Sequence, residues 1–226
     1  MHFARSMFLA TLLPLFAGCQ LTSLFDSPDT APAVLSGQTR MQGTLSASGG
    51  QLLFHPCDSQ RSFVIDDGGK TGILQEAATL SSQPGSLFAD LRGRFDGNTI
   101  ADKPGQLNLQ TLYRIERVEG ECKDPNFPLL GFYASGDQPA WNLKVNGQGL
   151  VIERPGEEPI ALPYLEEQLP GGRVNLSSDA NNRHIDVWMA PQRCVTGSRV
   201  SFLSAEVRID DQTYKGCAYL GGARSE

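Results

Sequence analysis

Apolar and polar residues alternate along many short stretches of the 226-residue chain, and turn-forming residues separate these stretches. A period of two places successive side chains on opposite faces of a strand, so the pattern predicts half-buried β-strands. The clearest hairpins turn at Gly49-Gly50 and at Asn146-Gly147, the second being a pair that a type I′ turn prefers. The predicted strands span residues 40–46, 51–55, 61–66, 87–95, 106–118, 141–145, 149–153, 160–162, 173–176, 183–189, 200–209 and 213–220.

One stretch has the helical period instead. Its apolar positions recur at the spacing of one helix face, at Ile73, Leu74, Ala77 and Ala78. Residues 73–80 are therefore expected to form a single short amphipathic helix.

Two prolines within residues 123–128 divide the predicted strands into two groups. We therefore expect a mainly β protein with two small antiparallel β-barrel or sandwich-like domains, at residues 40–123 and 127–222. The helix belongs to the first domain. Trp141 lies at an alternating position and is expected in the core, as are Leu107, Leu109, Leu112, Ile115 and Val118.

The beginning of the chain has the layout of an export signal. One cation, Arg5, precedes an apolar run at residues 7–16 and then the small residues Ala17 and Gly18. The apolar run is too short to cross a bilayer as a helix, so a permanent transmembrane span is not expected there.

The sequence Ala17-Gly18-Cys19 resembles the lipobox of bacterial lipoproteins, in which the cysteine becomes the acylated first residue. The resemblance implies a signal peptide at residues 1–18 and a lipid anchor on Cys19. The segment that follows is rich in Ser, Thr, Asp, Pro and Gly, so residues 19–39 are predicted to form a flexible tether. Gln20 follows the cysteine where an Asp often retains lipoproteins in the inner membrane. The expected location is thus the outer membrane of a Gram-negative bacterium, facing the periplasm. The alternative is an ordinary signal peptide followed by a chance cysteine.

Four cysteines remain after Cys19, namely Cys57, Cys122, Cys194 and Cys217. An even number suits disulfides in an oxidising compartment and allows three pairings. Because each pair brackets part of one β-rich segment, we expect Cys57–Cys122 and Cys194–Cys217. Metal ligation is the rival use, but the chain has no Cys-x-x-Cys and few histidines, so neither a metal nor a cofactor is expected.

Five motifs in the first predicted domain resemble the barrel of the NlpE family of envelope lipoproteins. They are Gly43-Thr44-Leu45, Gly49-Gly50, Phe54-His55-Pro56-Cys57, Leu91-Arg92-Gly93-Arg94 and the run from Glu116 to Cys122. The resemblance implies an oligonucleotide/oligosaccharide-binding-like (OB-like) barrel over residues 40–123. It also implies a part in signalling surface contact or lipoprotein-trafficking stress, or in copper tolerance. The family's copper-linked Cys-x-x-Cys is absent here, so copper handling is not expected.

The second predicted domain resembles an uncharacterised family of envelope lipoprotein domains over residues 130–221. The resemblance rests on residues 132–141, on Arg193-Cys194 and on Gly216-Cys217-Ala218. The usual form of the first motif is Gly-x-Glu-Pro-Phe-Trp, and Gln138 and Ala140 replace its Glu and Phe. The family implies no activity. Related proteins sometimes join such a domain to a lysozyme-inhibitor module.

The net charge is −6 at pH 7, from 19 basic and 25 acidic residues. An acidic chain of this kind is a poor partner for nucleic acid or for an anionic membrane surface.

One predicted strand carries residues with possible chemistry. Its alternation places His184, Asp186 and Trp188 on one face. A His–Asp pair could orient a general base, with Ser198 or Ser201 as nucleophile, but no Gly-x-Ser-x-Gly fixes either serine. A solvated face is the simplest interpretation, and a binding surface with a stacking Trp188 is the functional one.

Two other charged groups are candidates for binding. Arg92 and Arg94 flank Gly93 and could present a cationic groove to a glycan or an acidic partner, or could serve solubility alone. Glu166-Glu167 is predicted to lie in a polar loop between Pro163 and Pro170.

Together these features predict a non-enzymatic envelope sensor or adaptor that binds another envelope protein. The alternative is a periplasmic binding or inhibitory module for a cell-wall enzyme such as a lysozyme, or for cell-wall glycan. A hydrolase that uses His184 is the third and weakest hypothesis.

Overall fold

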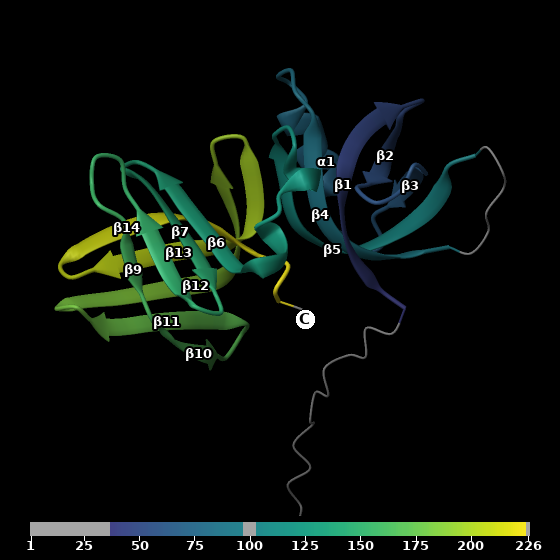
Figure 1. The fold of residues 1–226 in the computed structure, drawn as a ribbon. Coiled ribbons are helices and arrows are strands. Elements are labelled where there is room, and N and C mark those ends of the chain that lie inside the picture. Colours follow the sequence, from purple (N-terminus) through teal and green to yellow (C-terminus); the bar gives the residue numbers. More distant parts are fainter. Residues whose placement is uncertain (1–36, 97–102, 225–226) are drawn as a thin grey trace, which may run out of the picture. The chain divides into compact units, whose positions relative to one another are not determined.

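The computed structural model describes residues 37–96 and 103–224 (Figure 1). The predicted signal peptide, Cys19 and most of the predicted tether lie outside these residues. None of the described helices is both long and apolar enough to cross a membrane.

The first part of the fold is a closed barrel. It consists of β1 (Thr39–Ser48), β2 (Gln51–Pro56), β3 (Phe63–Asp66), α1 (Ile73–Leu80), β4 (Leu87–Phe95) and β5 (Gly105–Arg117). The strands lie in the order β3-β2-β1-β4-β5, and β3 also pairs in parallel with β5, which closes the sheet. This strand order, with the helix between β3 and β4, is that of an OB fold. The sequence pattern predicted a small barrel with one helix, and that prediction is confirmed.

The second part is an antiparallel sheet that follows two short 3₁₀ turns at Glu121–Lys123 and Phe127–Leu129. Its strands are β6 (Leu130–Asp137), β7 (Ala140–Asn146), β8 (Gly149–Glu153), β9 (Ile160–Leu162), β10 (Leu165–Leu169), β11 (Arg173–Ala180), β12 (Arg183–Thr196), β13 (Arg199–Ile209) and β14 (Gln212–Leu220). They lie in the order β9-β8-β7-β6-β14-β13-β12-β11-β10. The fold is therefore mainly β, and the predicted helix has the bounds that its periodicity indicated.

Two hydrophobic cores form, one within each part. Leu107, Leu109 and Ile115 are fully buried in the first core, while Trp141 is 4% exposed in the second. Val118, also predicted as core, is only half-buried. Of the six residues predicted as core, all but Val118 are therefore buried.

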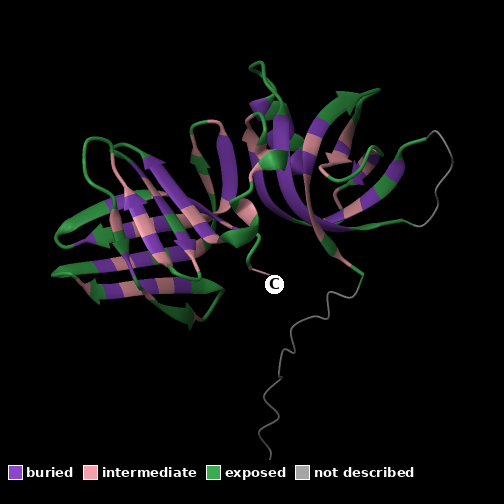
Figure 2. Cartoon of the chain, in the orientation of Figure 1, coloured by how far each residue is buried: buried purple, intermediate pink, exposed green. Residues whose placement is uncertain are grey.

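The sheet runs continuously from one part into the other. β13 pairs with β5 through Arg199–Glu116, Val200–Ile115 and Ser201–Arg114, and the side chain of Val200 belongs to the first core. Seven consecutive residues of β4 from Leu87 are buried, so both of its faces are covered there (Figure 2). The described residues from Gly37 onward accordingly form one compact unit around two cores.

Two strands were not predicted. Glu166 and Glu167 lie in β10, which pairs with β11, and not in the predicted loop. The reason is that β10 is held by backbone hydrogen bonds and is mostly exposed, so its sequence lacks the alternation of a half-buried strand. β6 also lacks clear alternation. Its chain packs closely on β14, where a Cβ on Gly216 would lie 2.0 Å from the carbonyl oxygen of Ser135.

The structure contains both expected disulfides. Cys57–Cys122 joins the end of β2 to the first 3₁₀ turn, with 5.3 Å between Cα atoms, and Cys194–Cys217 joins β12 to β14 at 5.4 Å. Their sequence separations are 65 and 23 residues. On the chain-entropy model, loops of these sizes stabilise the folded state by about 4 and 3.5 kcal/mol.

Candidate binding surface

The outer face of β12 carries the three residues that the sequence placed together. Trp188 is 46% exposed there, whereas Ile185 and Val187 on the opposite face are fully buried in the second core. His184 and Asp186 share the face of Trp188. A buried face on one side and an exposed indole on the other is the arrangement that a period of two predicts.

Charged side chains of both signs surround the indole. In the strand register Trp188 lies between Asn175 of β11 and Glu206 of β13, and Asp186 lies opposite Arg208. Lys215 of β14 extends the row, with 3.7 Å between its Nζ and Oε2 of Glu206. A groove of about 670 Å³ follows these strands, lined among others by Arg173, Asp186, Trp188, Gln192, Glu206 and Arg208.

His184 is held between two carboxylates. Its Nδ1 lies 2.6 Å from Oδ1 of Asp179, and its Nε2 lies 3.0 Å from Oδ2 of Asp186. The hydrogen bonds to Asp179 and Asp186 raise the pKa of His184, because they favour the protonated imidazolium. With both ring nitrogens engaged, this side chain is suited to a charged surface contact and poorly suited to act as a general base.

Neither candidate serine meets His184. Ser201 pairs with Cys194, ten residues along β12 from His184, which corresponds to about 30 Å of extended strand. The hydroxyl of Ser198 donates to the carbonyl oxygen of Arg117 at 3.2 Å. The hydrolase hypothesis thus finds no assembled triad among these residues.

The predicted Arg92–Arg94 groove does not form as an exposed pair. Arg94 is exposed, but Arg92 is only 6% exposed and its guanidinium carbon lies 5.6 Å from the ring centroid of Tyr113. The prediction was wrong for Arg92 because this side of β4 is covered, as fully buried Asp90 two residues earlier shows. An alternating sequence predicts that one face of a strand is exposed, so it could not show that both faces of β4 are buried.

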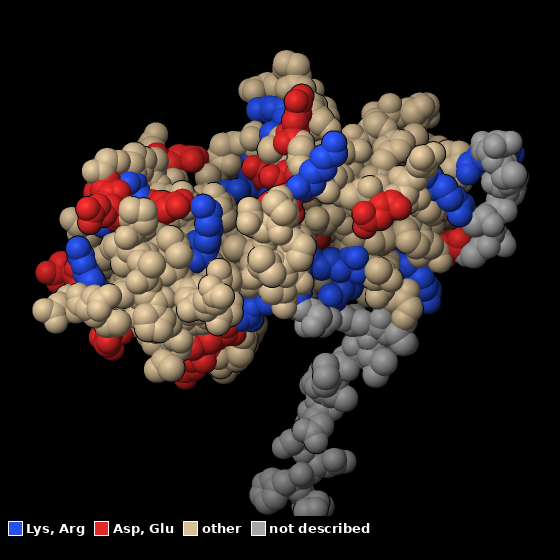
Figure 3. All heavy atoms as spheres, viewed as in Figure 1, with Lys and Arg blue, Asp and Glu red and all other residues tan. Residues whose placement is uncertain are grey.

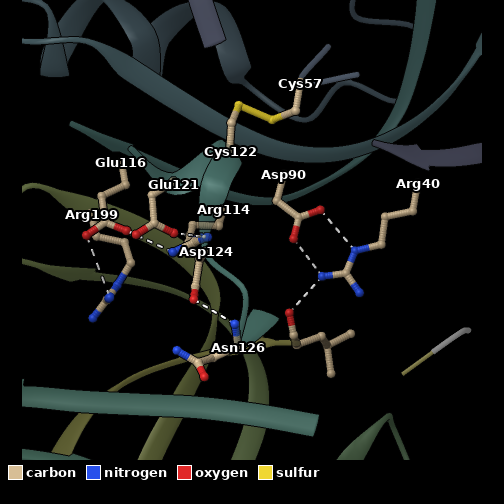
Figure 4. Close-up of polar contacts among 11 residues, drawn as sticks. Arg40, Cys57, Asp90, Arg114, Glu116, Glu121, Cys122, Asp124, Asn126 and Arg199 are labelled. Carbon is tan, nitrogen blue, oxygen red and sulfur yellow. Dashed lines mark hydrogen bonds and ion pairs between the residues drawn. A yellow bond between two sulfur atoms is a disulfide. The ribbon is translucent and has the colours of Figure 1, made fainter. Parts of the chain in front are cut away.

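The sequence analysis did not predict a buried polar network around Arg40, Asp90 and Arg114 (Figure 4). Arg40 of β1 binds Asp90 through two contacts, Nε to Oδ1 at 2.9 Å and Nη2 to Oδ2 at 2.6 Å. The same guanidinium donates to the carbonyl oxygens of Leu220 at 2.7 Å and Gly221 at 2.9 Å. Arg40 therefore ties the first barrel to the end of β14.

Arg114 is the centre of a second group in this network. Its side chain is 1% exposed, its Nη1 lies 3.1 Å from Glu116, and its Nη2 lies 2.9 Å from Glu121. The guanidinium also lies 4.0 Å from the ring centroid of Tyr219, and burial raises the pKa of that phenol to about 12. These residues join β5 to β14, so we infer that they hold the two parts together. The sequence does not distinguish a buried strand arginine such as Arg114 from an exposed one.

Arg193 of β12 forms a further link between the two parts, to Glu76 on α1. Its Nε lies 2.6 Å from one oxygen of the Glu76 carboxylate, and its Nη2 lies 2.9 Å from the other. The hydrogen bonds to Glu76 raise the pKa of Arg193, because they favour the charged guanidinium. Within residues 37–96 and 103–224, no three or more His, Cys, Asp or Glu side chains are grouped as a metal site.

Comparison with known proteins adds no relative. The chain matches no family model, no curated protein and no solved structure.

Proposed function

We propose that this chain is a lipid-anchored, non-enzymatic envelope protein that acts as a sensor or adaptor and binds another envelope protein through the Trp188 face. The observation that carries the proposal is the half-exposed indole at the centre of a mixed-charge surface on β11–β14. The lipobox-like Cys19 and the resemblance to envelope lipoproteins supply the expected location. Two disulfides suit an extracytoplasmic compartment.

The composition of the face favours a protein partner. Trp and Arg dominate the binding energy of protein interfaces, and a rim of both charge signs selects partners by complementarity. Acidic and basic side chains are likewise intermingled on the surface in view in Figure 3. Burying the exposed 46% of a Trp side chain of about 250 Å² would remove about 115 Å² from water. At about 25 cal/mol per Å² this contributes about 3 kcal/mol, so Trp188→Ala is expected to weaken binding about 100-fold.

The second candidate is a module that binds cell-wall glycan or inhibits a cell-wall enzyme. An exposed indole beside Asp186 and Gln192 in a groove could stack on a sugar ring while the polar side chains bind its hydroxyls. The same experiment separates the two candidates.

Photo-crosslinking in cells tests the proposal. The full chain would carry p-benzoyl-phenylalanine at position 192, an exposed groove position that leaves Trp188 in place, with position 74 as the matched control because Leu74 is 54% exposed on α1. We expect a discrete protein adduct from position 192 that is absent from position 74, identified by mass spectrometry. A glycan or lysozyme adduct at 192 would favour the second candidate. Identical adducts at both positions, or none at 192, would refute a specific surface there.

A further inference from the structure

A cavity of about 760 Å³ lies on the other side of β12 from the Trp188 face. Its walls come from β5, β6, β7, β10, β11, β12, β13 and β14, and the segment after β14 contributes Ala223 and Arg224. The volume is within the range of about 300–1,000 Å³ that is typical of small-molecule sites.

The wall of this cavity is mainly apolar. Phe202, Leu203 and Leu220 are partly exposed along it. Phe132, Met189 and Val174 also line it, but they belong to the packed second core and are 1%, 1% and 7% exposed. Apolar surface is better covered by hydrocarbon than by water, so this lining suits an acyl chain.

Polar groups gather around one part of the lining. The hydroxyl of Tyr164 donates to the carbonyl oxygen of Asn146 at 3.2 Å, and Gln168 lies nearby on β10. Burial raises the pKa of Tyr164, so this hydroxyl stays protonated and remains a donor at neutral pH.

Arg224 is the one charged side chain among the described residues that line the cavity. Its guanidinium carbon lies 3.9 Å from the ring centroid of Phe132, and its Nη2 meets the carboxylate of Glu166. A guanidinium has five N–H donors in a planar fork, so one carboxylate does not saturate it. A cation beside an apolar wall is complementary to a molecule with an anionic head and a hydrocarbon tail.

We propose that this cavity binds one single-chain fatty acid, with its carboxylate on Arg224 and its acyl chain against the partly exposed Phe202, Leu203 and Leu220. The site lies on the other face of β12 from the proposed partner surface, because the side chains of Trp188 and Met189 point to opposite faces of the sheet. Met189 is the one described residue that lines both hollows. The fatty acid is therefore a further ligand, and its binding is tested separately from binding of the protein partner.

Fluorescence titration with cis-parinaric acid tests the proposal. The protein would be the full chain with Cys19→Ser, purified without detergent so that no other amphiphile competes. We expect saturable binding of one probe per chain and displacement by palmitate. Hexadecanol, which has the same tail and no charge, is expected to compete about tenfold more weakly, because it lacks the charge-assisted hydrogen bonds to Arg224.

Two variants locate the ligand within the molecule. Arg224→Gln is expected to weaken palmitate about tenfold and leave hexadecanol unchanged, with Arg183→Gln as control because Arg183 is an exposed arginine paired with Asp210. Thr111→Trp places a large ring at an exposed position of the cavity lining and is expected to abolish binding of both competitors. Thr213→Trp, on an exposed position of β14, is the matched control, and thermal unfolding checks that both tryptophan variants fold.

Four results would overturn the proposal. Non-saturable probe binding, or equal affinity in folded Thr111→Trp and Thr213→Trp, would remove the cavity as the site. Equal competition by palmitate and hexadecanol in every variant would remove Arg224 as the carboxylate partner. Displacement by phosphatidylglycerol vesicles but not by palmitate would show that the cavity takes a chain from a two-chain lipid instead.

Discussion

The contact between Arg40 and Asp90 predicts an asymmetric loss of stability. Asp90 is fully buried and Arg40 is 15% exposed, and the guanidinium also donates to three carbonyl oxygens, those of Leu220, Gly221 and Arg224. Arg40→Ala removes the cation and leaves a buried carboxylate and these carbonyls without it. Breaking a buried ion pair by removing one partner costs about 3–5 kcal/mol, and the carbonyls place Arg40→Ala at the upper end.

Asp90→Asn is the milder change, because Arg40 keeps its carbonyl partners and an amide can still accept a hydrogen bond. We expect a loss of about 2–3 kcal/mol for Asp90→Asn against about 5 kcal/mol for Arg40→Ala. Urea unfolding of the full chain with Cys19→Ser, followed by circular dichroism, gives both values from the shift in midpoint at constant slope. Equal losses, or a loss below about 1 kcal/mol for Arg40→Ala, would refute the view that this arginine joins the barrel to β14.

Three further predictions address the anchor, the second disulfide and the histidine. Cys19→Ser is expected to move the protein from the membrane fraction to the soluble periplasm with both disulfides formed, and a product that stays on the membrane would contradict the lipobox interpretation. Replacing Cys194 and Cys217 together by alanine is expected to lower the unfolding free energy by about 3.5 kcal/mol, and reductant should then change the thermal midpoint less than in the parent. The raised pKa of His184 means that its protonated form stabilises the fold below pH about 6.5, and that this stability is lost as pH rises through the folded-state pKa. His184→Ala should therefore lower the urea midpoint at pH 5.5 and leave it unchanged at pH 9, and an equal loss at both would show that packing, not charge, is responsible.

Local patterns predicted the elements that have one buried face and one exposed face. The hairpin at Asn146-Gly147 follows from a period of two and its turn residues, and the helix Ile73–Leu80 follows from the helical period. The disulfide pairs followed from the grouping of the cysteines along the chain. Each of these features depends on neighbours in sequence or on counting, so a single sequence contains enough information to find it.

The features that were missed depend on partners distant in sequence. Arg40 and Asp90 are 50 residues apart, and Arg40 lies 180 residues from Leu220. Arg92 looks like a solvated strand residue until the packing on both faces of β4 is known. The cavity is likewise formed by segments from Thr111 to Arg224, so no local pattern could reveal it.

The position of β12 between the two proposed sites has a consequence for a sensor. Trp188 faces the proposed partner and Pro191 lines the cavity proposed for the fatty acid, so one strand belongs to both surfaces. Linkage requires that if an occupied cavity changes partner affinity, the partner changes fatty-acid affinity by the same factor. A rigid β12, buried on its inner face and paired on both edges, would transmit no such effect. The register shift between Pro191 and Cys194 is the place on β12 where its pairing with β13 is already interrupted. Movement that couples the two sites would therefore be expected first at this bulge, beside cavity residue Pro191 and groove residue Gln192.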